Sequence, residues 1–290
     1  MIEILNTVIP VFLIIAIGFI IGKKRKIDVQ PIVDLIIYIA GPSLIFVSLA
    51  KSNIELNDFL TMVIVTVVFT SILWLLAYII FKITKSKNYG LYLPMAHGNT
   101  GYLGWPIALF AFGIAGLSRA VIFDAVASVF LFSLGIYVVH RRNELKEIFK
   151  IPLIYALILG FLFNFFKIPV PKMAFSALEM IGMITIPAAL LVLGYKLTEI
   201  KLKSAKIAFL ASLFKIGIGF LVAFLVVALF SITGITRNII LLEASMPSAV
   251  FTMILCQKYK RDAALVASTV LISTLISIAT IPLILWFLSL

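Results

Sequence analysis

Ten apolar runs constrain the fold of this 290-residue chain more than any other feature of the sequence. Each is close to the length of about 20 residues that a helix needs to cross the hydrocarbon core of a bilayer. Inside a bilayer every backbone polar group must find a partner within the protein, and a continuous helix achieves this by itself. We therefore predict an all-α integral membrane protein with ten transmembrane helices. The approximate runs are 4–22, 31–50, 58–82, 88–113, 118–139, 151–166, 172–197, 204–230, 237–257 and 262–289.

The basic residues between these runs predict how the chain is oriented. If the N-terminus lies outside the cell, 18 lysines and arginines fall in inner loops and five, including Arg119, fall in outer loops. Short cytoplasmic loops carry such an excess. The first basic cluster, Lys23 to Lys26, follows the first run, whereas a secretory signal peptide has its positive charge before the run. We predict a multi-pass protein of the cell membrane with both termini extracytoplasmic.

The net charge of +12 is also explained by basic loops. The basic residues are scattered over several short loops instead of forming one stripe, so the sequence predicts no nucleic-acid binding. The lipid bilayer is the partner that the composition indicates, because 63% of the residues are hydrophobic and 12% are charged.

The two halves of the chain show the same order of runs. A shift of 145 residues places the first five runs on the last five and Pro42 on Pro187. Because five is an odd number, the second half has the opposite orientation in the membrane. We therefore predict an inverted 5+5 repeat, with residues 1–145 as the first unit and 146–290 as the second. Many secondary transporters are built in this way.

Two of the runs contain helix-breaking residues. Residues 93–106, in the fourth run, hold two prolines, three glycines, a histidine and an asparagine. Residues 243–248, in the ninth run, contain Pro247 between polar residues. Proline and glycine interrupt helices, and the freed backbone groups then need partners in protein or in a water-lined cavity. Interrupted helices at corresponding places in two repeats indicate a transporter's binding site.

The first interruption has the residue types that an organic anion needs. A restarted helix offers free N–H groups and a positive dipole to a carboxylate, and Asn and Thr side chains add donors. The alternative is a structural hydrogen bond between helices. The residues that we predict to bind substrate are Gly98, Asn99, Thr100 and Gly101, with Ser245, Pro247 and Ser248 at the second interruption.

Several ionisable residues lie inside the predicted membrane runs, where such groups are usually functional, and four of them are candidates for coupling or a charge relay. Glu243 could bind a proton or a cation, or it could pair with Arg237. His97 could titrate near neutral pH, or it could be a neutral partner of the freed backbone. Asp124 is a plausible partner of Lys215, either as a structural ion pair or as part of a charge relay.

Other functional classes lack support in the sequence. Two histidines and one cysteine are too far apart for a metal site. The chain has no P-loop, no dinucleotide-binding glycine motif and no nucleophile–base set. We predict no enzyme activity, no metal and no cofactor, and coupling to protons, to sodium or to neither stays open.

Three runs carry short motifs of the same kind as a known family. They are Asn99-Thr100 with Gly104 and Pro106, Ala244 and Pro247 with Phe251 and Tyr259, and Ser268-Thr269 with Pro282. In this order the motifs resemble those of the auxin efflux carrier family, which includes the plant PIN exporters and malonate-type permeases of bacteria and archaea, and the resemblance covers nearly the whole chain. The plant exporters have proline where this chain has Gly98, and glycine also permits a break in the helix.

This resemblance implies a fold similar to the sodium–bile acid symporters. Spans 1, 2, 6 and 7 would form a scaffold. Spans 3–5 and 8–10 would form a transport domain in which broken helices 4 and 9 cross. It also implies transport of small organic anions, such as carboxylates, by an elevator-like motion. The alternatives are a sodium-coupled organic-anion symporter and a sensor or channel with a transporter fold. An apolar scaffold face could form a homodimer.

Overall fold

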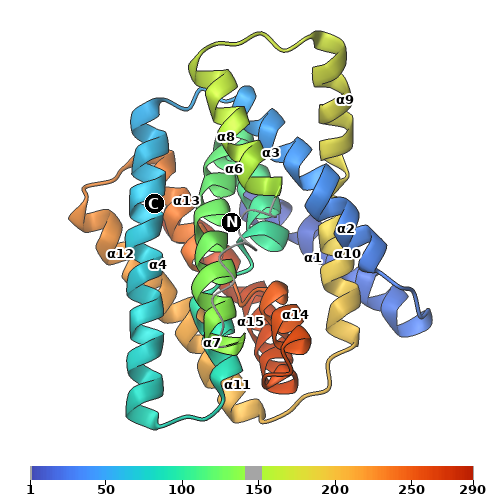
Figure 1. Ribbon diagram of the computed structural model, residues 1–290, viewed down its shortest axis with the longest axis vertical. Coiled ribbons are helices and arrows are strands. Elements are labelled where there is room, and N and C mark those ends of the chain that lie inside the picture. Colours follow the sequence, from blue (N-terminus) through green and yellow to red (C-terminus); the bar gives the residue numbers. More distant parts are fainter. Residues whose placement is uncertain (1, 141–151, 290) are drawn as a thin grey trace.

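The computed structural model describes residues 2–140 and 152–289, and all regular elements in these residues are helices (Figure 1). The predicted repeat boundary at 145 and the basic residues Arg141, Arg142, Lys146 and Lys150 lie outside the described residues. The elements are α1 (Ile2–Lys24), α2 (Gln30–Leu35), η1 (Ile36–Ala40), α3 (Gly41–Ala50), α4 (Leu56–Thr84), η2 (Tyr89–Leu91), α5 (Tyr92–Ala96), η3 (Thr100–Gly104), α6 (Trp105–Phe130), η4 (Leu131–Gly135), α7 (Ile136–His140), α8 (Pro152–Phe165), α9 (Lys172–Met183), α10 (Thr185–Thr198), α11 (Ala205–Leu213), η6 (Phe214–Ile218), α12 (Gly219–Leu229), α13 (Gly234–Ala244), α14 (Val250–Lys258) and α15 (Ala263–Leu288).

Seven stretches of the described helices are long and apolar enough to cross a membrane. An all-helical membrane protein is thus confirmed, whereas the ten-span inverted repeat stays a prediction. The predicted ninth run is divided into α13 and α14, and α8 is apolar but shorter than the seven. The seven stretches are Ile4–Lys24, Gln30–Ala50, Leu56–Thr84, Thr100–His140, Lys172–Thr198, Ala205–Leu229 and Ala263–Leu288.

The longest stretch, Thr100–His140, is bent at Gly113. This residue has φ 63° and ψ −158°, a conformation that L side chains rarely adopt and that glycine allows. The bend comes where the predicted fourth run ends. The chain therefore changes direction at this residue and continues as a helix on both sides of it. As a result, the predicted fourth and fifth runs are joined within α6.

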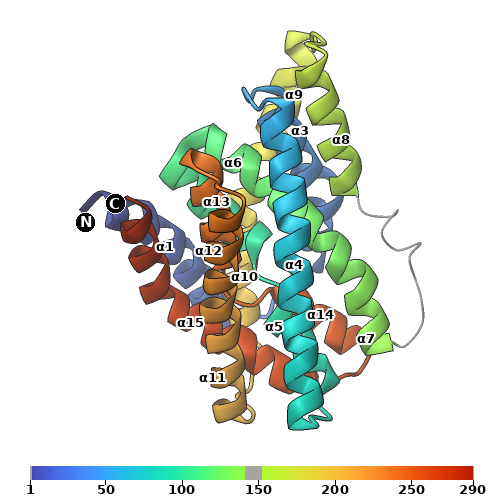
Figure 2. The same ribbon diagram turned by 90° about the vertical axis from the view of Figure 1, so that its left-hand side faces the viewer.

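The helices pack in two groups (Figures 1 and 2). The first group consists of α1–α3 and α8–α10, in which α1 packs on α10 and α3 packs on α8 and α9. The second group consists of α4–α7 and α11–α15, in which α6 contacts α4 and α13, and α11 contacts α15. In the first group α1 and α10 are almost in backbone contact. A Cβ on Gly194 would lie 2.0 Å from the carbonyl oxygen of Ile15, and small residues allow such close approach in membranes.

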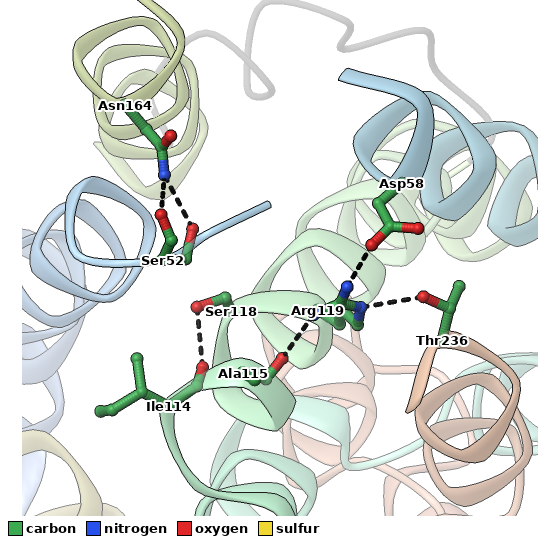
Figure 3. A network of polar contacts seen from close by, with 8 residues as sticks. All are labelled: Ser52, Asp58, Ile114, Ala115, Ser118, Arg119, Asn164 and Thr236. Atoms are coloured by element: carbon green, nitrogen blue, oxygen red, sulfur yellow. Dashed lines mark hydrogen bonds and ion pairs between the residues drawn. The ribbon is translucent and has the colours of Figure 1, made fainter. Parts of the chain in front are cut away.

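A buried arginine joins three helices of the second group (Figure 3). Arg119 of α6 forms an ion pair with Asp58 of α4, and its Nε donates to Thr236 Oγ1 of α13 at 2.8 Å. Its Nη1 donates to the carbonyl oxygen of Ala115 at 3.1 Å. The sequence placed Arg119 in an outer loop, and that expectation is wrong. Arg119 lies in the part of α6 that follows the kink at Gly113, where α4 and α13 pack against it, and it is 8% exposed. We call these four residues the Arg119 network.

Candidate functional site

The two predicted interruptions contact each other in the second group. Helix α5 ends at Ala96 and η3 begins at Thr100, while α13 ends at Ala244 and α14 begins at Val250. The linking segments, 97–99 and 245–249, lie antiparallel, with a bridge between Gly98 and Ser248. The N–H of Asn99 donates to the Pro247 carbonyl at 2.6 Å, and the N–H of Ala249 donates to the His97 carbonyl at 3.2 Å. Each interrupted helix therefore satisfies backbone groups of the other, as a membrane interior requires. We call this contact the crossing.

The two serines of the second interruption have different hydrogen-bond partners, and only Ser248 bonds to the first interrupted helix. Ser248 Oγ donates to the carbonyl of Pro94 at 2.8 Å, and the Ser248 N–H donates to Ser273 Oγ at 3.1 Å. Ser245 Oγ donates to the carbonyl of Leu241, in its own helix, at 2.6 Å. Ser245, Pro247 and Ser248, which the sequence predicts as binding residues, thus lie at the crossing but do not line the cavity described next.

A cavity of about 210 Å³ lies between the two helix groups, next to the crossing. The first group contributes residues of η1, α3, α8 and α10. The second group contributes residues 97–99, 101, 102 and 105, Asp124 and Ser128 of α6, Leu131 and Phe132 of η4, and Ala249 and Phe251. Of the predicted binding residues, Gly98, Asn99 and Gly101 line this cavity. Thr100 does not line it, and its hydroxyl donates a hydrogen bond to Asp124.

Five buried polar atoms that belong to cavity-lining residues have no hydrogen-bond partner among the described residues. An unpaired buried polar group destabilises the folded protein by about 1–3 kcal/mol. Five of them around one cavity therefore indicate a polar ligand. The amide nitrogen of Asn99 and the indole nitrogen of Trp105 can only donate, and hydroxyls can also donate, so the set suits an acceptor-rich ligand. The atoms are His97 Nδ1, Asn99 Nδ2, Tyr102 Oη, Trp105 Nε1 and Thr185 Oγ1.

Backbone N–H groups near the cavity are further hydrogen-bond donors for an acceptor-rich ligand. Segment η3 begins at Thr100 and α14 begins at Val250, both beside the cavity. The first N–H groups of a helix have no intrahelical acceptor, and the helix dipole there favours negative charge. The starts of both helices therefore place backbone donors close to the cavity.

Sequence reasoning missed three of these side chains. Tyr102 and Trp105 lie in the same interrupted stretch as Asn99, and that proximity was a usable signal. Thr185 begins α10 in the first group, about 80 residues further along the chain, and no local pattern marks it. Only the packing of the two groups brings Thr185 to the cavity.

The charged residues are arranged differently from the prediction. Lys215 is 1% exposed, and its Nζ donates to the carbonyl oxygens of Ala244 at 2.9 Å and Met246 at 3.0 Å. Asp124 lines the cavity and accepts from the Thr100 hydroxyl. No ion pair joins Lys215 to Asp124, so the predicted structural ion pair is wrong, and the charge relay stays a prediction. The physical reason is that the end of α13 leaves carbonyls free, and these accept from the ammonium group.

Glu243 has no exposed surface, and neither of its carboxylate oxygens has a partner among the described residues. Its carboxyl group lies against η3, where a Cβ on Gly104 would stand 2.1 Å from Oε2. The alternative pairing with Arg237 is wrong, because Arg237 Nη1 donates to Asn238 and its guanidinium lies over the ring of Phe287. Because Gly104 has no side chain, there is room beside η3 for the unpaired carboxyl group of Glu243.

Comparisons with known proteins agree with this geometry. The family model described as "Membrane transport protein" matches residues 3–148 and 139–285. An uncharacterized transporter of Methanocaldococcus jannaschii is 32% identical over 98% of both chains, and one of Methanothermobacter thermautotrophicus is 28% identical over 96% of both. Neither these names nor the family description indicates an enzyme. The chain is therefore a multi-pass membrane transporter that belongs to the membrane transport protein family, the auxin efflux carrier family that its motifs resemble.

Proposed function

We propose that this protein is a secondary transporter of small organic anions and that a carboxylate group of the substrate binds in the cavity beside the crossing. The observation that carries the proposal is the set of five unpaired polar atoms around one cavity. A carboxylate offers two oxygens with about four acceptor sites, which matches a wall rich in donors. The first N–H groups of η3 and α14 would add to the binding.

The size of the cavity supports a small substrate. An engineered protein cavity of about 150 Å³ accommodates benzene. At about 210 Å³, this cavity has room for a carboxylate with a few carbon atoms. Its apolar side, which includes Leu131, Phe132 and Phe251, would contact the carbon skeleton while the donors hold the charged end.

Two charges near the cavity bear on the coupling ion. Asp124 lines the cavity, and among the described lining residues there is no lysine or arginine. The nearest ammonium, that of Lys215, lies behind Gly98, 3.0 Å from where a Cβ of that residue would be. Two carboxylates repel each other strongly in a site of low dielectric. We therefore propose that the substrate binds together with a proton on Asp124. The other titratable groups of this region are His97, Tyr102 and Glu243.

The position of the cavity supports alternating access by relative movement of the two groups. In this proposal the ten spans form an inverted repeat with both termini outside the cell. The first group is the scaffold, through which a homodimer could form, and the second group is the transport domain. Sliding of the second group would separate the donors near Asn99 from Thr185 and expose the site to the other side. The substrate drives such a shift only through its different affinity for the two states.

Thermal stability with a panel of carboxylates tests the binding site, because a ligand that binds the native state raises the melting temperature. One anion should stabilise the wild-type protein. Asn99→Ala should bind it at least about tenfold more weakly, because a hydrogen bond to a charged group contributes about 1.5–3 kcal/mol. Asn57→Ala changes an exposed asparagine and should respond like the wild type.

Counterflow of the same anion in liposomes then separates a carrier from a channel or sensor, since only a carrier accumulates labelled substrate against unlabelled substrate. An Asn99→Ala protein that responds like the wild type would exclude the crossing as the binding site. A panel without any stabilising anion would exclude this substrate class.

A further inference from the structure

Lys215 is a buried charge that the proposed anion site does not contact. It lies in η6, a π-helical segment between α11 and α12, and its side chain is directed to the end of α13. We propose that the ammonium group of Lys215 permanently fills a cation-binding position at the crossing, so that the transporter needs no sodium. The claim about transport rests on the proposed function, whereas the filling of the position does not.

The end of α13 has the features of a cation site. Ser245 caps the helix, and the carbonyls of Ala244 and Met246 both accept from Lys215 Nζ, at 2.9 and 3.0 Å. The last carbonyls of a helix lack intrahelical donors, and the dipole there favours positive charge. Unwound carbonyls and C-terminal ends of half-helices are the groups that coordinate sodium in transporters with broken helices. Here the protein supplies the cation itself.

The surroundings leave no room for a second cation at these oxygens. A Cβ on Gly98 would stand 3.0 Å from Nζ and 3.1 Å from Cε of Lys215. A Cβ on Gly219, one helical turn beyond Lys215, would lie 2.5 Å from the Ala244 carbonyl oxygen. The ammonium group is thus enclosed between two glycines and two carbonyls, and a sodium ion could bind there only by displacing it.

Glu243 is a second ionisable residue at this end of α13. It is fully buried on the same helix end, and its oxygens have no partner among the described residues. The charged groups whose fields reach it are Asp124 and Lys215. Removal of the lysine would leave the carbonyls of Ala244 and Met246 without their donor, and carbonyl oxygens are ligands that suit a hard cation.

Melting temperatures of the purified protein in sodium chloride and in choline chloride, at equal ionic strength and without substrate, test the proposal. The wild type should melt at the same temperature in both salts. Lys215→Ala opens the position, and it should melt several degrees higher in sodium than in choline. Lys215→Met is the matched control, because it removes the charge but fills the space, and it should show no difference between the salts.

Two results would overturn the inference. One is a wild-type protein that sodium specifically stabilises, and the other is a folded Lys215→Ala protein that responds like Lys215→Met. If Lys215→Ala does not fold, the melting temperatures of the wild type in the two salts decide. Counterflow by the wild type is a second measurement, and its rate should be the same with choline in place of sodium. Because the melting experiment uses no substrate, its result stands even if the anion proposal fails.

Discussion

The Arg119 network lies within the second helix group and the cavity lies between the two groups, and these two polar regions differ in how their polar atoms are paired. Around Arg119, an ion pair and two hydrogen bonds connect α4, α6 and α13. Around the cavity, five polar atoms have no partner among the described residues. Arg119 is buried, and so are the five unpaired atoms, so burial alone does not separate a structural polar group from a binding one.

The difference teaches how function can be recognised in a membrane interior. A fully paired network stabilises one arrangement of helices. Unpaired donors destabilise the empty protein and become favourable only when a ligand accepts their hydrogen bonds. Changes in the network should therefore alter stability, and changes around the cavity should alter affinity.

The largest expected effect is on stability and comes from Arg119→Met. The change removes the ion pair and two hydrogen bonds, and we expect a loss of about 2–4 kcal/mol. The loss should be smaller than for a fully buried pair because the Asp58 side chain is 40% exposed. The melting temperature should fall by several degrees, while the affinity of the folded protein for its anion stays the same. Arg25→Met, at an exposed arginine, is the control. An unchanged melting temperature would show that the network is not structural.

A smaller effect, on affinity, should follow from Trp105→Phe. Trp105 lines the cavity, and its buried indole N–H has no partner among the described residues. Loss of this donor should weaken anion binding by about tenfold while the stability of the empty protein changes little. Trp74→Phe is a matched control, because Trp74 Nε1 is also buried and unpaired but does not line the cavity. Titration of the anion by thermal shift measures both variants. Equal losses in the two would mean that unpaired atoms do not mark the site.

The smallest effect should come from Thr185→Val, which removes a hydroxyl and keeps the shape of the side chain. A neutral hydrogen bond contributes about 0.5–1.5 kcal/mol, so affinity should fall a few-fold. Thr70→Val is the control, because its buried hydroxyl is also unpaired but lies away from the cavity. If Thr185→Val leaves both affinity and counterflow unchanged, the first helix group does not contribute to the site.

The helical membrane architecture and the positions of the interruptions could be predicted from the sequence. Run length and apolar composition decide whether a segment crosses a bilayer, and these are local properties. Proline and glycine act on the backbone where they stand, so the breaks near Gly98 and Pro247 were also visible. For the same reason, Asn99 and Gly101 could be named as residues of the cavity wall.

Contacts between distant segments could not be predicted in this way. Lys215 binds carbonyls of Ala244 and Met246 instead of Asp124, and Thr185 reaches the cavity from the other helix group. Arg119 is buried among three helices instead of lying in a loop. A local pattern shows which groups need partners in the membrane, but the partner is chosen by which helices pack together, and that arrangement exists only in the folded protein.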